Sequence, residues 1–390
     1  MNQETVTVFL EGRIDSANAP ETERKILAKM QEQPDSIPVF DASRLDYIAS
    51  AGLRILMKVR KTVGQEMEIR NVSPEVYEIL ETTGFTELFR VKKRMREVSV
   101  EGCDVIGRGF YGTVYRLDPD TIVKVYSSPD SLPLIENERK MARMAFVHGI
   151  PTAISYDIVK VGDSYGSVFE LLKAQTMNDL LAARPDRADE LVRTLTDVMK
   201  TVHAVELEPG TLPSARGIWL GYLDLIRGLG YITEAQYARI GKLISDLPEF
   251  CGVVHGDFHM KNVMMADGEP LLIDMDTLTQ GSPIFDLQGI YVAYQAFEED
   301  EPGNARAFLG ISAEMAGFVW RRTIEYYFDQ KDAETRARNE DRIRLLAAVR
   351  FLQIIGATDL KTNELAEIRI RHTGETIETL LGRVESLILE

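Results

Sequence analysis

The feature that most restricts the fold is a run of three glycines, Gly107, Gly109 and Gly112, in G-x-G-x-x-G order within GRGFYGTV. In a dinucleotide-binding turn such glycines lead from a strand into a helix. Here the β-rich run TVYRL follows, and after a Pro-Asp turn comes another strand-like segment, TIVKVY. The glycines are therefore expected in a β-hairpin, where the absence of Cβ atoms lets the backbone approach phosphate oxygens. Taken alone, the pattern is equally compatible with a glycine-rich hairpin that binds no ligand.

Lys124 lies between apolar residues in TIVKVY, on a strand expected to face the interior. An unpaired ammonium group is costly in such a place, so Lys124 needs anionic partners. Nucleotide phosphates are one such partner, and a carboxylate of the following helical segment IENERKMARMAF is another. Glu138 is the expected carboxylate, and Glu136 is its competitor on the same helix. The alternative is an edge lysine that reaches solvent.

The segment VVHGDFHMKNVMM places a polar loop between two apolar stretches, with H-x-D-x-x-x-x-N spacing. Phosphoryl transfer requires a carboxylate that orients the attacking hydroxyl and accepts its proton, and a neutral oxygen ligand for magnesium nearby. Asp257 and Asn262 fit these two roles. His255 is expected to organise the loop by hydrogen bonds, and His259 is interpreted as non-catalytic.

Twelve residues after Asn262, the apolar strand of LLIDMD ends at Asp274, and Asp276 follows. Magnesium prefers oxygen ligands from one or two carboxylates together with substrate phosphates. Asp274 is therefore the expected metal ligand, while Asp276 either assists or is solvated. Asp286, in PIFDLQG, is expected to brace the loop that holds His255 and Asp257. The order of these segments predicts an enzyme that uses ATP and Mg2+.

A chain of 390 residues exceeds the size of one hydrophobic core, so two domains are expected. Residues 1–97 alternate strand-like segments, among them 37–42, with helix-like segments, and predict a small α/β domain. From residue 98 the pattern changes to strands, then a helix at about 136–147, further strands and a largely helical remainder. This predicts a two-lobed α+β domain, with a β-rich lobe at about 98–172 and a helical lobe at about 173–390.

The composition of the chain indicates which cellular compartment and which binding partners are expected. The first 97 residues hold 15 basic and 16 acidic side chains, so nearly all of the net charge of −16 belongs to the second domain, which should repel nucleic acid. An acidic surface suits a cationic substrate, but it also serves solubility alone. The two cysteines have no metal-ligand or disulfide spacing. No apolar run reaches membrane-spanning length, so a cytoplasmic protein without a membrane partner is expected.

With these motifs in place, Gly107 to about Glu390 resembles the aminoglycoside phosphotransferase and choline kinase family of the protein-kinase-like fold. The resemblance rests on HGDFHMKN, with Gly256 where protein kinases usually carry arginine, and on LLIDMD and PIFDL. Only about a dozen residues separate Asp274 from Asp286, and no A-P-E element follows, which favours a small-molecule hydroxyl acceptor over a peptide. The full glycine loop is closer to that of protein kinases, so the substrate class stays open.

Residues 1 to about 97 resemble a STAS domain, the fold of bacterial anti-sigma factor antagonists, in GRIDSANAPE, VFDASRLDYIASAGLRIL and NVSPEVYEILETTGFTELF. In that family a serine where a loop meets a helix is phosphorylated, which controls partner binding. Ser50 is the only hydroxyl residue at that junction and is the possible phosphosite, and it is also expected to be a plain helix N-cap. Ala49 and Ala51 depart from the family pattern.

Three functions remain open on the sequence. One is a small-molecule kinase with a STAS-like docking or regulatory domain. A second is a regulatory protein kinase of an anti-sigma or partner-switching system, acting on a STAS serine such as Ser50 or on a partner protein. The third is a nucleotide-binding scaffold, which the presence of Lys124, Asp257, Asn262 and Asp274 argues against.

Overall fold

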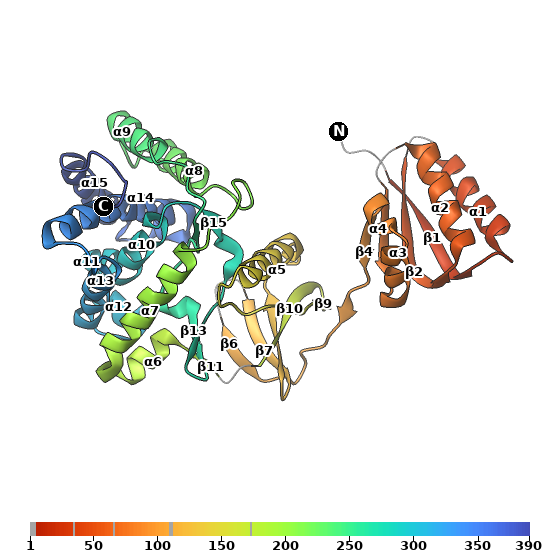
Figure 1. Cartoon of the computed structure of the whole chain (residues 1–390), viewed down its shortest axis with the longest axis horizontal. Coiled ribbons are helices and arrows are strands. Elements are labelled where there is room, and N and C mark those ends of the chain that lie inside the picture. Colours follow the sequence, from red (N-terminus) through yellow and green to blue (C-terminus); the bar gives the residue numbers. More distant parts are fainter. Residues whose placement is uncertain (1–4, 34–35, 65–66, 109–111, 172–173) are drawn as a thin grey trace. The chain divides into compact units, whose positions relative to one another are not determined.

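The protein is described by a computed structural model, which covers residues 5–33, 36–64, 67–108, 112–171 and 174–390. Residue contacts divide the chain into two compact units (Figure 1). One unit comprises Met1–Ser99 with Ile158–Asp163, and the other comprises Val100–Asp157 with Ser164–Glu390. Among the described residues, no helix combines the length and the apolar character needed to cross a membrane.

The first unit contains a four-stranded sheet in the order β1-β2-β3-β4, with every neighbouring pair parallel. Parallel strands need crossover connections, which the helices between them supply. The elements are β1 (Thr5–Ile14), α1 (Ala19–Glu32), β2 (Ile37–Ile48), α2 (Ser50–Val63), β3 (Glu68–Val72), α3 (Pro74–Thr82), α4 (Phe85–Leu88) and β4 (Arg90–Lys93). β5 (Arg96–Glu97) pairs in parallel with β9 (Asp157–Val161).

The second strand of this sheet is longer than the sequence pattern predicts. It was expected to span residues 37–42, but it continues to Ile48 because its pairing with β1 extends past two register shifts to Arg13↔Tyr47 and Ile14↔Ile48. Side chains from both strands and from α2 fill one apolar core. The long strand carries the chain directly into α2 after a single residue, Ala49.

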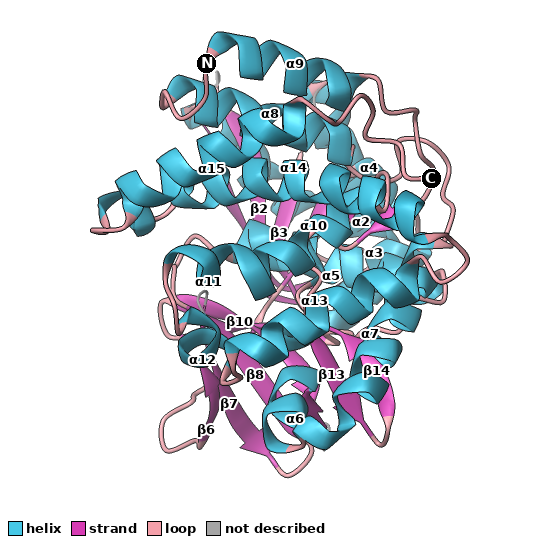
Figure 2. Ribbon diagram, turned by 90° about the vertical axis from the view of Figure 1, so that its left-hand side faces the viewer, coloured by secondary structure: helices cyan, strands magenta, loops and turns pink. Residues whose placement is uncertain are grey.

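The second unit begins with antiparallel strands that are neighbours in the order β10-β8-β7-β6 (Figure 2). They are β6 (Val105–Arg108), β7 (Gly112–Asp118), β8 (Thr121–Tyr126) and β10 (Ser164–Glu170), and α5 (Leu132–Val147) lies between β8 and β9 in sequence. The helix was expected at 136–147. It begins four residues earlier because Pro133 is compatible with a first helical turn.

The rest of this unit is mainly helical and buries one large apolar core. Its helices are α6 (Met177–Ala183), α7 (Ala188–His203), α8 (Ala215–Gly228), α9 (Glu234–Ser245), α10 (Ile284–Tyr291), α11 (Phe297–Asp300), α12 (Asn304–Leu309), α13 (Ala313–Tyr327), α14 (Ala333–Ala357) and α15 (Ala366–Leu381). Two small sheets lie within it: β11 (Ala174–Thr176), β13 (Val263–Ala266) and β14 (Glu269–Leu272), and the pair β12 (Val253–Val254) with β15 (Thr279–Gln280). The polar loop of residues 255–262 runs from β12 to β13.

Candidate active site

Lys124 has two carboxylate partners. Its Nζ lies 2.7 Å from Asp274 Oδ1 and 3.3 Å from Glu138 Oε1. Glu138 comes from the buried face of α5, whereas Glu136 is exposed on the same helix. Burial acts to lower the pKa of Lys124, but the charges of Glu138 and Asp274 outweigh it and hold the pKa above its usual value. The lysine is therefore a fixed cation.

The far oxygen of Glu138 is also occupied. The hydroxyl of Tyr126, on the same strand as Lys124, donates to Glu138 Oε2. Both carboxylate oxygens of this nearly buried residue therefore have partners, as a buried charge requires. Glu138, held in turn by Tyr126, therefore keeps Lys124 in a defined position on β8.

Asp257 and Asn262 lie together in the loop between β12 and β13. The amide Nδ2 of Asn262 donates to the backbone oxygen of Asp257 at 2.9 Å and to its Oδ2 at 3.1 Å. Burial acts to raise the pKa of Asp257, but the hydrogen bond and charge of His259, followed by the charges of His255 and Arg350, lower it well below its usual range. Asp257 is thus ionised at any pH at which the protein would work.

Asp286 of α10 braces this loop, as expected from the sequence. Its Oδ2 accepts the backbone N–H of His255 at 2.8 Å, and its Oδ1 accepts that of Gly256 at 2.6 Å. His255 is fully buried, and its Nε2 lies 3.0 Å from the carbonyl oxygen of Ile273. The loop is therefore held from α10 on one side and from the end of the β14 strand on the other.

His203 is a supporting residue that the sequence analysis missed. Its Nε2 lies 3.0 Å from Asp286 Oδ2, and its Nδ1 lies 2.7 Å from the hydroxyl of Tyr327. These residues come from α7, α10 and α13, and His203 and Asp286 are 83 positions apart in the sequence. The sequence around His203 reads as the end of an amphipathic helix, and nothing in it indicates a contact with Asp286.

Gly256 is needed for its backbone conformation and for its lack of a side chain. Its φ is +87°, and a Cβ at this position would lie 2.6 Å from the carbonyl oxygen of Thr277. Thr277 in turn donates its hydroxyl to the carbonyl oxygen of His255 at 2.7 Å. A side chain here would push apart the two loops that carry Asp257 and Asp274.

Replacing Gly256 by alanine is therefore expected to lower turnover by about 100-fold or more, because small displacements of catalytic groups have large effects. The free energy of unfolding should fall by roughly 1–3 kcal/mol. Gly268→Ala is the matched control, since Gly268 has φ +89° but a Cβ there would meet nothing within 4 Å. Thermal unfolding and steady-state turnover of both variants test this. Equal losses of turnover in the two would contradict the role given to Thr277.

Asp274 follows β14 and adopts a left-handed conformation, with φ 56° and ψ 58°. For a residue with a side chain this conformation is unusual and often marks a functional site. The preceding residue, Ile273, donates its backbone N–H to the carbonyl oxygen of Asn262 at 3.0 Å. Asp274 and Asn262 are therefore brought to neighbouring positions from two strands of one hairpin.

Asp276 lies close to Asp274 and Glu138 without an ion-pair partner of its own among the described residues. Burial raises the pKa of Asp276 to about 6, and the charges of Glu138 and Asp274 add to the effect. The carbonyl oxygen of Asp276 accepts a long hydrogen bond, 3.5 Å, from Asn137 Nδ2 of α5. The three carboxylates form a negatively charged cluster beside Lys124.

The three glycines of the hairpin differ in their surroundings. At Gly112 a Cβ would lie 2.1 Å from the carbonyl oxygen of Val125, so β7 approaches β8 too closely for a side chain. Gly107, on β6, would place a Cβ in ordinary contact with Val114. Gly109 lies outside the described residues. The close packing of β7 on β8 therefore requires a glycine at position 112, independently of any approach of its backbone to phosphate.

Ser50 is the exposed first residue of α2 and is not its N-cap, so the expected cap was wrong. The N-cap is Ala49, whose carbonyl oxygen accepts the backbone N–H of Leu53 at 3.0 Å. Ala49 is held in an extended conformation because its own N–H donates to the carbonyl oxygen of Ile14 at 2.8 Å. Pairing with β1 therefore sets where the helix begins, and the Ser50 hydroxyl makes no capping bond.

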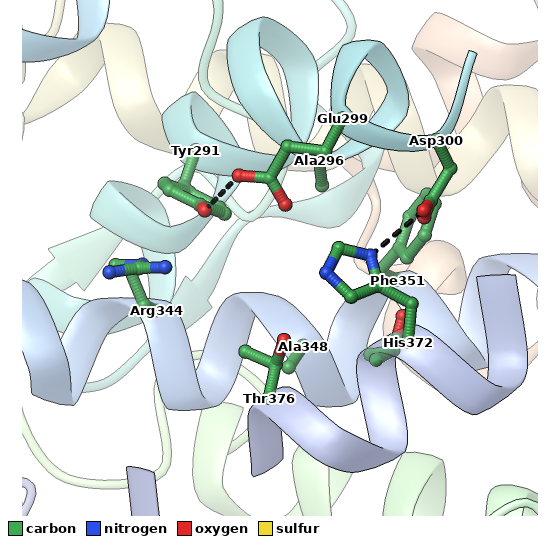
Figure 3. Close-up of a pocket in the computed structure, with 10 residues that line it drawn as sticks. Tyr291, Ala296, Glu299, Asp300, Arg344, Ala348, Phe351, His372 and Thr376 are labelled. Atoms are coloured by element: carbon green, nitrogen blue, oxygen red, sulfur yellow. Dashed lines mark hydrogen bonds and ion pairs between the residues drawn. The ribbon is translucent and has the colours of Figure 1, made fainter. Parts of the chain in front are cut away.

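A separate polar pocket lies among α10, α11, α14 and α15 (Figure 3). The Tyr291 hydroxyl donates to Glu299, and His372 Nδ1 lies 2.8 Å from Asp300 Oδ1. Arg344 lies over the ring of Tyr291, at 5.3 Å from its centroid. Lys124, Asp257 and Asp274 do not line this pocket. Its polar side chains pair with one another and are separate from the cluster described above.

Residues 103–326 match the model of the phosphotransferase enzyme family, APH, over more than half of the chain. The chain belongs to this family. Residues 1–98 match the STAS domain model. Over 85 residues the chain is 38% identical to the "Putative anti-sigma factor antagonist BtrV" of Bordetella bronchiseptica, which covers 21% of this chain and 72% of that protein. This chain therefore combines an N-terminal STAS domain with an APH phosphotransferase domain.

Solved structures similar to the chain include other phosphotransferases. The ADP-bound aminoglycoside phosphotransferase APH(2'')-Ib is 14% identical and covers 79% of this chain and 99% of its own, with a TM-score of 0.49. A choline/ethanolamine kinase family protein from Mesorhizobium loti is 15% identical and covers 72% and 91%, with a TM-score of 0.44.

The family assignment confirms the fold class expected from the sequence, an α/β STAS domain followed by a protein-kinase-like phosphotransferase domain. It also confirms that the chain is an enzyme of the phosphotransferase class.

Proposed function

We propose that the chain transfers the γ-phosphoryl group of ATP to a hydroxyl group of a small molecule, and that its STAS domain docks or regulates the enzyme. We place the boundary between the domains near residues 97 and 98. The observation that best supports this reaction is the placement of Asp257 with Asn262 on one loop and of Lys124 with Asp274 beside it. Phosphoryl transfer depends mainly on positioning and electrostatic stabilisation, and these groups provide both.

In this reaction Lys124 binds the α- and β-phosphates, while Glu138 keeps it in position at 3.3 Å. The backbone around Gly107, Gly109 and Gly112 covers the phosphates. Because Lys124 stays protonated, its contribution is a fixed positive charge that does not change with pH near neutrality.

The residues at hand fit a magnesium ion. Asp274 and Asn262 offer the hard oxygen donors that Mg2+ prefers, just after β14 and just before β13, at the open end of one hairpin. Within the described part of the chain no three His, Cys, Asp or Glu side chains cluster as a metal site. Asp274 and Asn262 would therefore hold the ion together with oxygen donors from the nucleotide phosphates and water. The ion would neutralise charge that develops on the transferred phosphoryl group.

Asp257 accepts the proton of the attacking hydroxyl and orients it. The hydrogen bond from Asn262 to Oδ2 at 3.1 Å fixes the rotation of the carboxylate. Its lowered pKa keeps it ionised, so the carboxylate acts mainly by orienting the hydroxyl and accepts the proton late, when the acceptor oxygen has become acidic.

Magnesium–nucleotide binding is expected to release a proton near pH 6, because the cation favours the ionised form of Asp276, whose pKa is about 6. As pH falls through about 6, more Asp276 is protonated and the affinity for magnesium–ATP should fall; above pH 7 it should level off. Calorimetry with magnesium and a non-hydrolysable ATP analogue, in two buffers of different ionisation enthalpy, measures the release. Asp276→Asn should abolish it, and unchanged release in this variant would contradict the assignment.

The direct test measures turnover of ATP with magnesium in the presence of amino alcohols, sugars or aminoglycosides. A sample that contains the protein without any added acceptor is measured beside them. Mass spectrometry should detect a phosphorylated small molecule that Asp257→Asn does not produce. The proposal would be overturned if the wild type did not turn over ATP, or if Asp257→Asn turned it over as fast as the wild type.

A second candidate function is phosphorylation of a STAS serine or of a partner protein. The observation that favours it is Ser50, exposed at the start of α2 in a STAS domain of the same chain. A phosphate there would meet free backbone N–H groups at the helix start and change the charge that a partner protein contacts. Phosphosite mapping after incubation with ATP and magnesium, in wild type, Ser50→Ala and Asp257→Asn, decides it. Phosphate on Ser50 that Asp257→Asn loses would favour this function over the first.

A further inference from the structure

Arg344 of α14, in the polar pocket of Figure 3, is a partly buried cation without a paired carboxylate. Its guanidinium lies 5.3 Å from the centroid of the Tyr291 ring, and its Nε is buried with no hydrogen-bond partner in the described part of the chain. Among the described residues no carboxylate oxygen lies within ion-pair distance of it, whereas Arg342 on the same helix pairs with Glu390. A buried N–H group without a partner is costly, so Arg344 indicates a place for an acceptor that the chain does not supply.

The acidic side chains near Arg344 have other donors. Burial acts to lower the pKa of Arg344, but Tyr291 and Glu299 are among the groups that outweigh it and hold the pKa above its usual value. The carboxylate of Glu299 accepts the Tyr291 hydroxyl. That of Glu340 accepts Trp320 Nε1 at 3.3 Å. Arg344 is therefore a permanent cation beside acids that other groups already engage.

The space beside Arg344 is large enough for a small molecule. Arg344, His372 and Thr376 line the pocket of Figure 3 and also its outer part, which extends along α15 to Arg383. The outer part has a volume of about 280 Å3, just below the roughly 300–1,000 Å3 of sites for drug-sized ligands. Figure 3 shows the side chains of Arg344 and His372 on opposite sides of one space, with Thr376 between them. The pocket therefore fits a small organic molecule.

The donors of this pocket suit an anion. His372 Nδ1 lies 2.8 Å from Asp300 Oδ1, and Figure 3 shows the other ring nitrogen directed into the pocket. Because Asp300 balances its charge, a protonated ring can donate a second hydrogen bond through this nitrogen. Thr376 adds a hydroxyl, and Arg383 adds a second, largely exposed guanidinium whose own ion pair is loose, at 3.7 Å.

The pocket also lies beside an irregular segment of helix. α10 continues into a π-helical segment, Val292–Ala296, and both Tyr291 and Ala296 line the pocket. Within this segment the hydroxyl of Tyr294 accepts the backbone N–H of Met260, in the catalytic loop, at 3.2 Å. Such π-helical turns are frequent at functional sites. Their presence here supports a binding role for the pocket.

We propose that this pocket binds a small molecule through a carboxylate or phosphate group, at a site separate from that of phosphoryl transfer. The guanidinium of Arg344 binds either group through charge-assisted hydrogen bonds, which two parallel N–H donors also orient. Thr376 and His372 bind the remaining oxygens. The proposal does not depend on the phosphotransfer reaction proposed above, because Lys124, Asp257 and Asp274 do not line the pocket.

The test uses probes that differ only at one carbon: D-glucose 6-phosphate, D-glucuronate and D-glucose. Each is titrated by calorimetry into the full chain with magnesium and a saturating non-hydrolysable ATP analogue, which occupies the proposed nucleotide site. At least one anionic probe is expected to bind with a Kd of about 1 mM or lower, and at least about 10-fold more tightly than glucose. The phosphate and carboxylate arms show which group the pocket prefers.

Arg344→Gln should lower the affinity for the anionic probe about 10- to 100-fold, because it removes a charged hydrogen-bond donor. Arg344→Lys should restore part of the affinity, which a folding defect would not allow. Arg371→Gln is the matched control, since Arg371 is exposed on α15 next to His372 and does not line the pocket. It should retain the wild-type affinity.

A gain of binding provides a test that loss of structure cannot imitate. Glu375 is an exposed carboxylate that lines the outer part of the pocket and repels an anion there. Glu375→Gln should therefore increase the affinity for the anionic probe about 2- to 5-fold, the range expected for an exposed charge. A decrease in this variant would contradict the charge assignment of the pocket.

The imidazole NMR signals of His372, assigned by comparison with His372→Gln, locate the bound anion. They should shift during the titration, whereas those of His255 and His259 in the catalytic loop should not. Four outcomes would overturn the proposal: no anionic probe with a Kd below about 10 mM, glucose bound as tightly as both anions, an affinity unchanged in Arg344→Gln, or unchanged His372 signals on binding. ATP turnover tests the proposed reaction separately.

Discussion

Replacing Asp257 by asparagine is expected to lower turnover by about 100- to 10,000-fold while the affinity for ATP with magnesium changes less than about threefold. In the proposed reaction the carboxylate orients the acceptor hydroxyl and makes no essential contact with the nucleotide. Asparagine has the same shape and can still meet Asn262, which donates to Asp257 Oδ2 at 3.1 Å. The loss should therefore report the missing charge and proton acceptor.

Turnover and nucleotide affinity must be measured on the same preparation, by steady-state kinetics and by calorimetry. Asp267→Asn is the matched control, because Asp267 is an exposed aspartate at the turn that joins β13 to β14. A variant at Asp257 that keeps wild-type turnover would show that the catalytic loop has been assigned wrongly. A large loss of ATP affinity would instead move Asp257 to the nucleotide or metal site.

Replacing Asp274 by asparagine should have the opposite signature. The affinity for ATP in the presence of magnesium is expected to fall at least about 10-fold, because an anionic metal ligand is removed and Asn262 alone is a weak one. Without magnesium, ATP affinity should fall little or even rise, since a carboxylate that repels phosphates is lost. Lys124 keeps Glu138 as a partner, at 3.3 Å, so its position should survive.

Calorimetric titration of ATP with and without magnesium separates these effects. Glu138→Gln is the informative comparison, because it removes the other carboxylate partner of Lys124 without removing a proposed metal ligand. It should reduce turnover yet preserve the dependence on magnesium. If Asp274→Asn preserves that dependence as well, the metal role belongs to Asp276.

Local sequence patterns determined most of the fold and the content of the candidate site. Strand and helix periodicity predicted the α/β domain and the later change from strands to helices, because side-chain alternation depends only on which face of an element is buried. The loop containing Asp257 and Asn262 was readable for a similar reason, since its chemistry needs residues within a few positions of one another.

Tertiary structure decided what depends on the rotation of a helix or on contacts between distant segments. Glu138 partners Lys124 because α5 turns that residue toward β8 and leaves Glu136 exposed. Ala49, and not Ser50, caps α2 because strand β1 holds Ala49 in an extended conformation.

The support that His203 gives to Asp286 likewise comes from a helix far away in sequence. The amino-acid sequence contains the residues that form such contacts, but it does not show which of them packing brings together. Local patterns therefore identified the residues of the candidate site, and only the packing of α7, α10 and α13 brought His203, Asp286 and Tyr327 together behind the loop of Asp257.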